Sequence, residues 1–253
     1  EICHCLVGSE MCIRDRDSER WLPDENCPFF IGEFVAADGP HPLCPRSVLK
    51  GVLGEYAELG LHVRSGFEYE FFVFDETARS AKDKDYRNLT PLTPGNFGYS
   101  VLRASTQSSN FIELMDWCRR MDCDIEGLHC ETGPGVWEAA LQSHTGVEAA
   151  DRANIFKTFA KVFFQKRDLM ATFMAKWSMQ YPGQSGHFHF SVCDANDVNI
   201  FADGTAPQGM SEAQRFAVGG LQRYLPELLP MLAPTINSLS LIHISEPTRQ
   251  WQI

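Results

Sequence analysis

The sequence predicts an α+β fold built on a largely antiparallel sheet. Strand-like and helix-like segments do not alternate strictly along the chain, as they would in a parallel α/β fold. Apolar residues make up 44% and charged residues 22% of the 253 residues, which is the composition of an ordinary globular protein. A chain of this length can bury a substantial hydrophobic core.

The first half of the chain predicts two strands and a helix. Residues 28–38 are rich in Phe, Ile and Val, which favours a strand. Apolar residues recur at helical spacing over 46–59, and Gly60 is a natural stop for that helix. In residues 67–75 aromatic and acidic side chains alternate at the start, and the stretch is rich in aromatic residues, which predicts a second strand. The polar stretch 76–98 predicts a loop.

The second half adds three helices and four strands. A long amphipathic helix is expected over 148–170, and Ser211 is expected to begin the last helix through a capping box with Gln214. That last helix runs towards Leu228, with Pro226 as a late kink. The other predicted elements are a helix over 107–121 and strands over 123–131, 136–142, 171–176 and 187–193.

Charge and cysteine usage exclude several classes of function. The net charge of −11 argues against nucleic acid and against an anionic membrane surface as partners, because both require clustered Lys and Arg. The sequence contains no run of 18 apolar residues, so it predicts no membrane span. The nine cysteines form no CxxC pair, which argues against a zinc ribbon and a secreted disulfide framework. Reduced thiols and a cytoplasmic location are therefore expected.

Two pairs of acids are candidates for a metal site. Glu68 and Glu70 are two residues apart on a predicted strand, so both carboxylates project from one face. Glu131 and Glu138 flank Gly133-Pro134-Gly135, a turn that can bring both acids to a common point. Clustered carboxylates repel one another, and a hard divalent cation such as Mg²⁺ relieves that repulsion. The alternatives are solvent-facing acids and an ordinary hairpin.

A histidine pair adds to these acids. His187 and His189 share one face of a predicted strand, Ser191 continues that face, and Phe188 between them is expected in the core. Histidine is the commonest metal ligand and donates hydrogen bonds to phosphate. The sequence has no GxxxxGK[ST], GxGxxG, GxSxG or HExxH motif, so the acids and histidines favour metal-assisted phosphate chemistry.

These residues lie in segments that resemble, in order, the motifs of the glutamine synthetase family. The resemblance extends over about residues 20–238 and implies a partial, half-barrel catalytic domain at 46–238, preceded by a remnant of a β-grasp domain at 17–45. The segments that carry it are GFEYEFFVFD (66–75), ETGPGVWE (131–138), ATFMAK (171–176) and GQSGHFHFS (183–191), with PRSVLK (45–50) and LAPTINS (232–238) as flanks.

The resemblance implies a role for each matching residue. Glu70, Glu131 and Glu138 match the ligands of a first metal ion, next to the substrate glutamate. Glu68 and His187 match ligands of a second metal ion, next to the ATP phosphates. Glu131 and His187 are expected to take part in catalysis, and Glu70 and Gly183 to border the substrate. Positions that contact ATP are matched by Glu126, His189 and Ser191.

The implied reaction is ATP-dependent ligation of glutamate and ammonia through γ-glutamyl phosphate, with two Mg²⁺ or Mn²⁺ ions. A ring-shaped homododecamer is expected for the full-length parent. The family usually has Asn where Pro182 precedes Gly183, which favours an amine or polyamine acceptor as the alternative. A non-catalytic structural member of the fold and a metal-dependent hydrolase of another fold are the remaining hypotheses.

Both ends of the sequence resemble translated sequencing-adapter strings, GSEMCIRDR at 8–16 and LSLIHISEPTR at 239–249. Residues 1–16 and 239–253 are therefore expected to be artefactual, and the chain to be a fragment. In the family, a further ligand of the second metal ion and the arginines that clamp phosphate lie beyond the position of Ser238. We therefore expect the 253-residue chain by itself to be inactive.

Overall fold

The computed structural model describes residues 12–14 and 18–238 of the chain. The adapter-like stretches expected at 1–16 and 239–253 lie outside these residues, apart from Cys12–Arg14. Within the described residues no helix is both long enough and apolar enough to cross a membrane. Within residues 18–238 the six cysteines, one exposed and five buried, are all free thiols.

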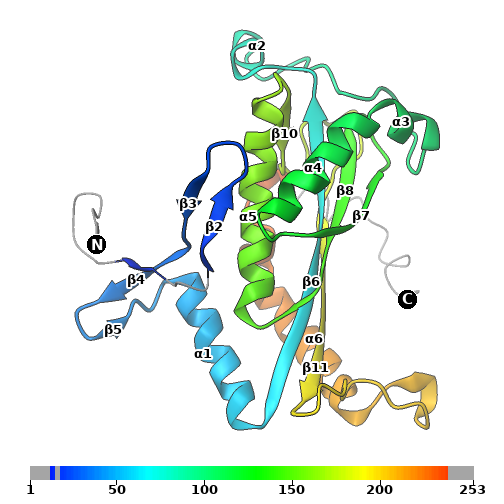
Figure 1. The fold of residues 1–253 in the computed structure, drawn as a ribbon. Helices are drawn as coiled ribbons and strands as arrows, with labels where there is room; N and C mark the ends of the chain where they lie inside the picture. The colour runs from blue at the N-terminus through cyan, green and yellow to red at the C-terminus, as the bar shows by residue number, and fades with distance from the viewer. Residues whose placement is uncertain (1–11, 15–17, 239–253) are drawn as a thin grey trace.

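A six-stranded antiparallel sheet organises the structure, and its longest strand, β6 (Leu61–Phe74), runs the length of the molecule in Figure 1. One edge of β6 pairs with β8 (Val136–Leu141) and β9 (His144–Thr145), and the other with β10 (Met170–Thr172) and β11 (Gly186–Asp194). Strand β7 (Ile125–Cys130) pairs with β8. The α+β class with an antiparallel sheet is confirmed.

Two helices, α4 (Ser108–Arg120) and α5 (Val147–Gln165), cover one face of this sheet (Figure 1). Alternate side chains of β6, including Phe71, point into this core because successive residues of a strand face opposite ways. Phe111 of α4 stacks on Trp137 of β8, with ring centroids 3.6 Å apart. Phe71 packs against Phe156 of α5, and all four side chains are at most 4% exposed.

The other face of β6 is apolar only at its end. Phe72 and Phe74 are completely buried there, and Trp177 covers them with ring centroids 6.4 and 5.0 Å away. Glu68 and Glu70 precede these phenylalanines on the same face, because residues two apart on a strand point the same way. Thus one strand carries a core on one side and two carboxylates on the other.

The N-terminal part departs from the expected single strand over 28–38. That stretch is divided between β3 (Cys27–Phe29), which pairs with β2 (Arg20–Leu22), and β4 (Gly32–Ala36), which pairs with β1 (Cys12–Arg14) and β5 (Gly39–Pro40). The break has a local cause, because the Ile31 N–H donates to the Ser18 hydroxyl at 2.9 Å instead of to a neighbouring strand. Helix α1 (Pro45–Glu58) follows and ends before Gly60, as predicted.

Several element boundaries also differ from prediction. The expected loop at 76–98 contains α2 (Ala78–Asp83), and α3 (Val101–Thr106) precedes α4. Helix α5 stops at Gln165 instead of 170, because Asp168 turns the chain with a φ of 57° and Met170 begins β10. Strand β10 ends at Thr172 instead of 176.

The last helix, α6 (Glu212–Leu232), follows a 3₁₀ turn at Pro207–Gly209 and continues past Pro226 to Leu232. Its N-cap is Ser211, whose hydroxyl accepts from the Gln214 N–H at 3.1 Å, while the Ser211 N–H donates to Phe201. Only one half of the expected capping box is therefore formed.

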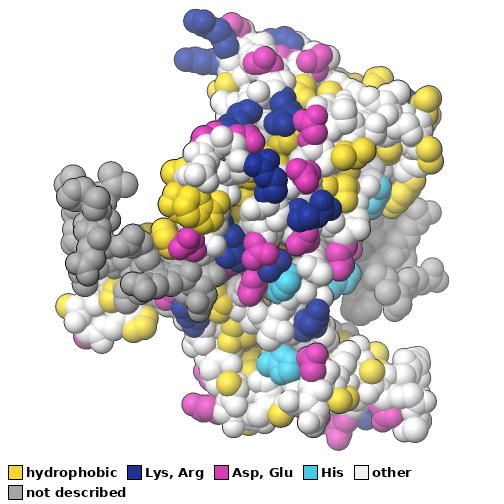
Figure 2. Space-filling model, viewed as in Figure 1, with side chains coloured by type: hydrophobic (Ala, Val, Ile, Leu, Met, Phe, Trp, Pro, Cys, Tyr) yellow, Lys and Arg dark blue, Asp and Glu magenta, His cyan; other side chains and the backbone are white. Residues whose placement is uncertain are grey.

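On the face shown in Figure 2, basic and acidic side chains are interspersed over the region of α4 and α5.

A buried carboxylate fixes the chain between β6 and α2. The Glu76 side chain, 2% exposed, accepts from the Lys84 ammonium, from the Ser80 hydroxyl at 2.6 Å and from the Thr90 N–H at 2.9 Å. Burial acts to raise the pKa of Glu76, but these hydrogen bonds, that of Lys84 foremost, outweigh it and lower the pKa to about 2. The ionised form of Glu76 therefore stabilises the folded state.

We expect Glu76→Gln to lower the free energy of unfolding at pH 7 by on the order of 2 kcal/mol. Because the folded pKa lies below its ordinary value of 4.5, this stabilisation is complete above about pH 4.5 and is lost as the pH falls towards 2. Urea unfolding at several pH values measures both effects, with the exposed Glu55→Gln as the control. Equal pH dependence in Glu76→Gln and the unsubstituted protein would contradict this assignment.

Candidate functional site

The sheet side remote from α4 and α5 carries a cluster that we call the acid face: Glu68, Glu70, Glu131 and Glu138 with His129, His187 and His189. Its first group centres on Glu68 of β6. His187, directly opposite on β11, places Nδ1 2.7 Å from Glu68 Oε2, and His189 Nε2 lies 3.3 Å from the same oxygen. Burial acts to raise the pKa of Glu68, but hydrogen bonds from both imidazoles hold it below its usual value.

The second group centres on His129 of β7, which the sequence alone did not single out. His129 pairs with Glu138 across the β7–β8 ladder. Its Nε2 lies 3.3 Å from Glu131 Oε1 and 3.4 Å from Glu138 Oε2. The signal that could have found it is spacing, since His129 precedes Glu131 by two residues and faces the same way. Glu138 Oε1 also lies 3.9 Å from His187 Nδ1, which joins the two groups.

Glu70 lies between the two groups. It is directly opposite Glu138 in the β6–β8 ladder, and its Oε2 accepts from the Ser185 N–H at 2.5 Å. Burial, together with the neighbouring Glu131, raises the pKa of Glu70. Burial and the charges of Glu70 and Glu68 likewise raise the pKa of Glu138. Both carboxylates therefore sit where negative charge is incompletely balanced by the protein.

Tyr99 is a further neighbour that sequence reasoning missed. Its ring stacks on His129, with centroids 5.1 Å apart, and its hydroxyl donates a hydrogen bond to Glu131. This hydrogen bond, together with the negative charge, raises the pKa of Tyr99 to about 12. Burial acts to raise the pKa of Glu131, but the hydrogen bonds from Tyr99, the Thr132 N–H and His129 lower it. Tyr99, the residue directly after the predicted loop at 76–98, thus contributes to the acid face.

The turn between Glu131 and Glu138 depends on glycine. Gly135 has a φ of +71°, and a Cβ there would lie 2.5 Å from the Val73 carbonyl oxygen. Its own N–H donates to Thr93 and its carbonyl accepts from Val73, at 2.9 and 2.8 Å. This conformation returns the chain so that Glu131 and Glu138 both reach His129. The predicted convergence of these two acids is confirmed.

A second close approach holds β11 against β6. A Cβ at Gly186 would collide with the Glu68 carbonyl oxygen. We expect Gly186→Ala to lower the free energy of unfolding by about 1–3 kcal/mol, because β11 must shift away from β6. Urea unfolding measures the change. Gly204→Ala, with open space around its Cβ, is the control and should change stability by less than about 0.5 kcal/mol. Equal losses for the two variants would contradict the argument.

The residues expected to contact ATP lie together at a smaller cavity. Glu126, His189 and Ser191 all line a cavity of about 360 Å³, together with Arg64 of β6. His189 belongs both to this cavity and to the group around Glu68. The predicted nucleotide residues are therefore adjacent to the acid face.

A larger cavity of about 1210 Å³ borders the other part of the acid face. Its lining includes Glu68, Glu70 and His187 as well as Pro182 and Gly183, the loop expected to border substrate. Phe188 also lines this cavity and is 56% exposed, so the prediction that it lies in the core is wrong. In the described part of the chain the Phe188 ring contacts those of Phe67 and Phe190, with centroids 4.9 and 5.7 Å away.

The donors of the acid face fit divalent cations. Carboxylate oxygens and imidazole nitrogens are ligands of Mg²⁺ and Mn²⁺. The atoms of Glu68, His187 and His189 lie within 4.8 Å of one another, and those of His129, Glu131 and Glu138 do so as well. The raised pKa values of Glu70 and Glu138 indicate negative charge that a cation would balance.

The sequence and fold match known proteins. A family profile described as glutamine synthetase, catalytic domain, matches residues 42–243. Type-1 glutamine synthetase 2 of Dictyostelium discoideum is 41% identical over 227 residues, 88% of this chain and 43% of that protein. Gamma-glutamylethanolamide synthetase GlnA4 of Streptomyces coelicolor is 32% identical over 221 residues, 87% of this chain and 47% of that protein.

A solved structure described as a GmaS/ADP complex superposes with a TM-score of 0.81 at 24% identity, covering 90% of this chain and 52% of that one. This superposition confirms the predicted fold of the chain. The chain spans less than half the length of the two curated relatives. Because the family profile covers most of the chain and the Dictyostelium relative is 41% identical over 88% of it, the protein belongs to the glutamine synthetase family of ligases.

Proposed function

We propose that the protein containing this chain is an ATP-dependent ligase that joins the γ-carboxylate of glutamate to ammonia. The observation that carries the proposal is the acid face, on which two donor groups lie side by side and Glu138 contacts a histidine of each. Two cations at such positions suit transfer of a phosphoryl group between two anionic substrates. Family membership supports the same class of reaction.

In this proposal the γ-phosphoryl group of ATP moves to the γ-carboxylate of glutamate, and ADP leaves. The ammonia nitrogen then attacks the acyl carbon, phosphate leaves, and the nitrogen loses a proton to give the amide. When bound, the two divalent cations would neutralise charge that accumulates on the phosphoryl oxygens.

The chain's own residues would hold the reactants in place. We assign Glu70, Glu131 and Glu138 to the first cation, and Glu68 and His187 to the second. Backbone ladders place His187 opposite Glu68 and Glu138 opposite Glu70, which preorganises these donors. The catalytic contribution proposed for Glu131 and His187 is this positioning.

The nucleotide and glutamate would occupy the two cavities. We assign ATP to the cavity lined by Glu126, His189 and Ser191, and glutamate to the larger cavity beside Gly183. The related structure described as an ADP complex supports nucleotide binding in this fold. Mg²⁺ or Mn²⁺ is the proposed metal, and a ring-shaped homo-oligomer is proposed for the longer protein.

An organic amine is the second candidate for the acceptor. Pro182 stands before Gly183, and Met174 and Phe188 line the adjacent cavity of about 1210 Å³, which exceeds what ammonia requires. The relative named as gamma-glutamylethanolamide synthetase supports an amine in this role.

The test is an assay of γ-glutamyl product and ADP with the longer parent protein, glutamate, ATP and Mg²⁺. Ammonia is compared with ethanolamine and a polyamine as the nitrogen donor. Product with ammonia at the highest kcat/KM supports the first proposal, and product mainly with an amine supports the second. ADP release without any γ-glutamyl product would refute both.

A further inference from the structure

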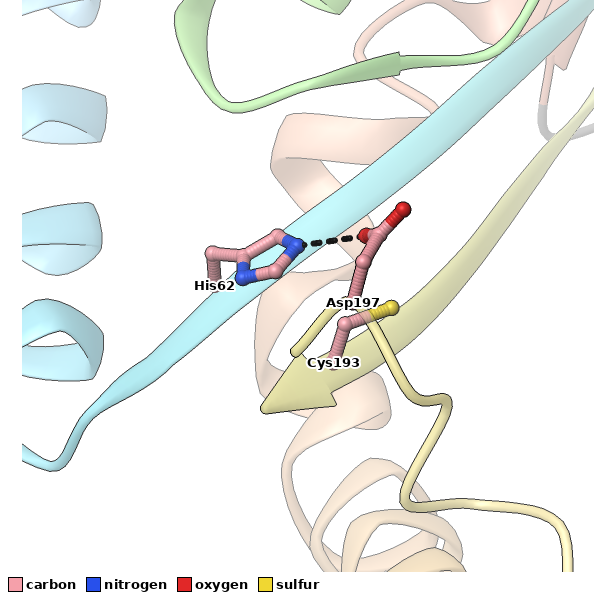
Figure 3. Close-up of side chains that lie close together, drawn as sticks. All are labelled: His62, Cys193 and Asp197. Carbon is pink, nitrogen blue, oxygen red and sulfur yellow. Dashed lines mark hydrogen bonds and ion pairs between the residues drawn. The ribbon is translucent and has the colours of Figure 1, made fainter. Parts of the chain in front are cut away.

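Away from the acid face, three side chains of different chemistry meet near the start of β6. They are His62, Cys193 and Asp197, one donor atom from each lying within 4.8 Å of the other two. Figure 3 shows His62 directed at the Asp197 carboxylate, with Cys193 beside it at the end of β11. His62 Nε2 and Asp197 Oδ1 are 2.9 Å apart.

The backbone fixes this arrangement. His62 and Cys193 are direct partners in the antiparallel β6–β11 ladder, where opposed side chains stand close together on one face. Asp197 follows in a tight turn, with a φ of 60° and its N–H donating to the Asp194 carbonyl at 3.0 Å. The Asp194 carboxylate accepts from the N–H groups of Asn196 and Val198, at 2.8 and 3.0 Å. This turn brings Asp197 back over the strand end.

Thiolate, imidazole and carboxylate are together the ligands that Zn²⁺ takes in proteins, commonly three of them with a water as the fourth. A hard cation such as Mg²⁺ would not select a thiolate. In a tetrahedral zinc site the ligand atoms lie roughly 3–4 Å apart, so the observed group needs only small side-chain rotations to close around an ion.

The surroundings also suit a cation. Cys193 is 3% exposed, whereas the side chains of His62 and Asp197 are 32% and 67% exposed, which leaves one side open for entry and for a water ligand. In the described part of the chain, Asp197 forms an ion pair with His62 and with no lysine or arginine. Asp194 adds a second negative charge next to the turn.

This group is separate from the acid face. His62 and Glu68 are six residues apart on β6, which corresponds to roughly 20 Å along a strand. The two places also differ in chemistry, because the acid face has carboxylates and imidazoles with no thiol among its donors.

We propose that His62, Cys193 and Asp197 form a binding site for Zn²⁺ or a similarly thiophilic divalent cation. Binding releases the proton of the Cys193 thiol to solvent, and no oxidation or reduction is involved. The bound ion links the turn after β11 to the first residues of β6. It therefore stabilises the folded state in proportion to its occupancy.

Cobalt titration of the 253-residue chain, with a phosphine reductant, tests the site. Co²⁺ stands in for Zn²⁺ because a thiolate bound to it gives a near-ultraviolet charge-transfer band. We expect Co²⁺ to produce this band, Zn²⁺ to abolish it, and Cys193→Ser to lack it. Cys27→Ser, which removes an exposed thiol, is the matched control and should keep it.

Two further variants keep the outcome decisive if Cys193→Ser does not fold. His62→Ala and Asp197→Asn should each weaken Co²⁺ binding at least about tenfold, the range expected for loss of a contribution to a metal site. Glu138→Gln on the acid face should leave the band unchanged, so this proposal and the proposed function fail independently. Absence of the band, or its persistence at full affinity in Cys193→Ser or in both further variants, overturns the site.

Discussion

Glu138→Gln should reduce the affinity of the chain for Mn²⁺ by more than about 100-fold, beyond the 10- to 100-fold typical of residues that only support a metal ligand. Glu138 is 7% exposed and contacts both His129 and His187. Removal of its charge therefore affects both donor groups. Electron paramagnetic resonance of free Mn²⁺ during a titration measures the affinity.

The same substitution should make the metal-free protein more stable. Burial and the nearby charges of Glu70 and Glu68 raise the pKa of Glu138, so its ionised form is disfavoured in the fold at pH 7. A neutral amide removes that repulsion, and the midpoint of thermal unfolding should rise without metal. This opposition of stability and binding is typical of a functional site.

The control for Glu138→Gln is Glu55→Gln, which removes an exposed carboxylate on α1. Glu55→Gln should leave both the Mn²⁺ affinity and the unfolding midpoint near those of the unsubstituted chain. Unchanged Mn²⁺ affinity in Glu138→Gln would show that the acid face is not the main metal site of this chain.

Phe71→Ala should lower the free energy of unfolding by about 3–5 kcal/mol, a large part of the 5–15 kcal/mol typical of a folded domain. Phe71 is completely buried, and its ring lies 5.5 Å from that of Phe173 and 6.0 Å from that of Phe156. Alanine would leave a cavity under the part of β6 that carries Glu70. Urea unfolding followed by tryptophan fluorescence measures the loss.

Phe188→Ala is the matched control, because it removes the same side chain from an exposed position on β11. It should cost less than about 1.5 kcal/mol, since the Phe188 ring keeps contact mainly with neighbouring rings. A loss as large as that of Phe71→Ala would mean that Phe188 is buried in solution, as the sequence pattern first suggested.

The sequence by itself determined which residues share a face. A period of two along 67–75 separates Glu68 and Glu70 from Phe71, and the same period pairs His187 with His189. These features depend only on neighbouring residues in one strand, so they can be read from the order of side chains. The glycine turn before Glu138 is local in the same way.

Only the tertiary structure decided which strands meet. The contact of His187 with Glu68 joins residues 119 positions apart, and the pairing of β6 with both β8 and β11 creates the acid face. His129 and Tyr99 join it through ladder register and ring stacking. Phe188 has the hydrophobicity of a core residue, yet its exposure depends on what covers β11. Contacts between distant segments are set by packing of the whole chain, which no local pattern records.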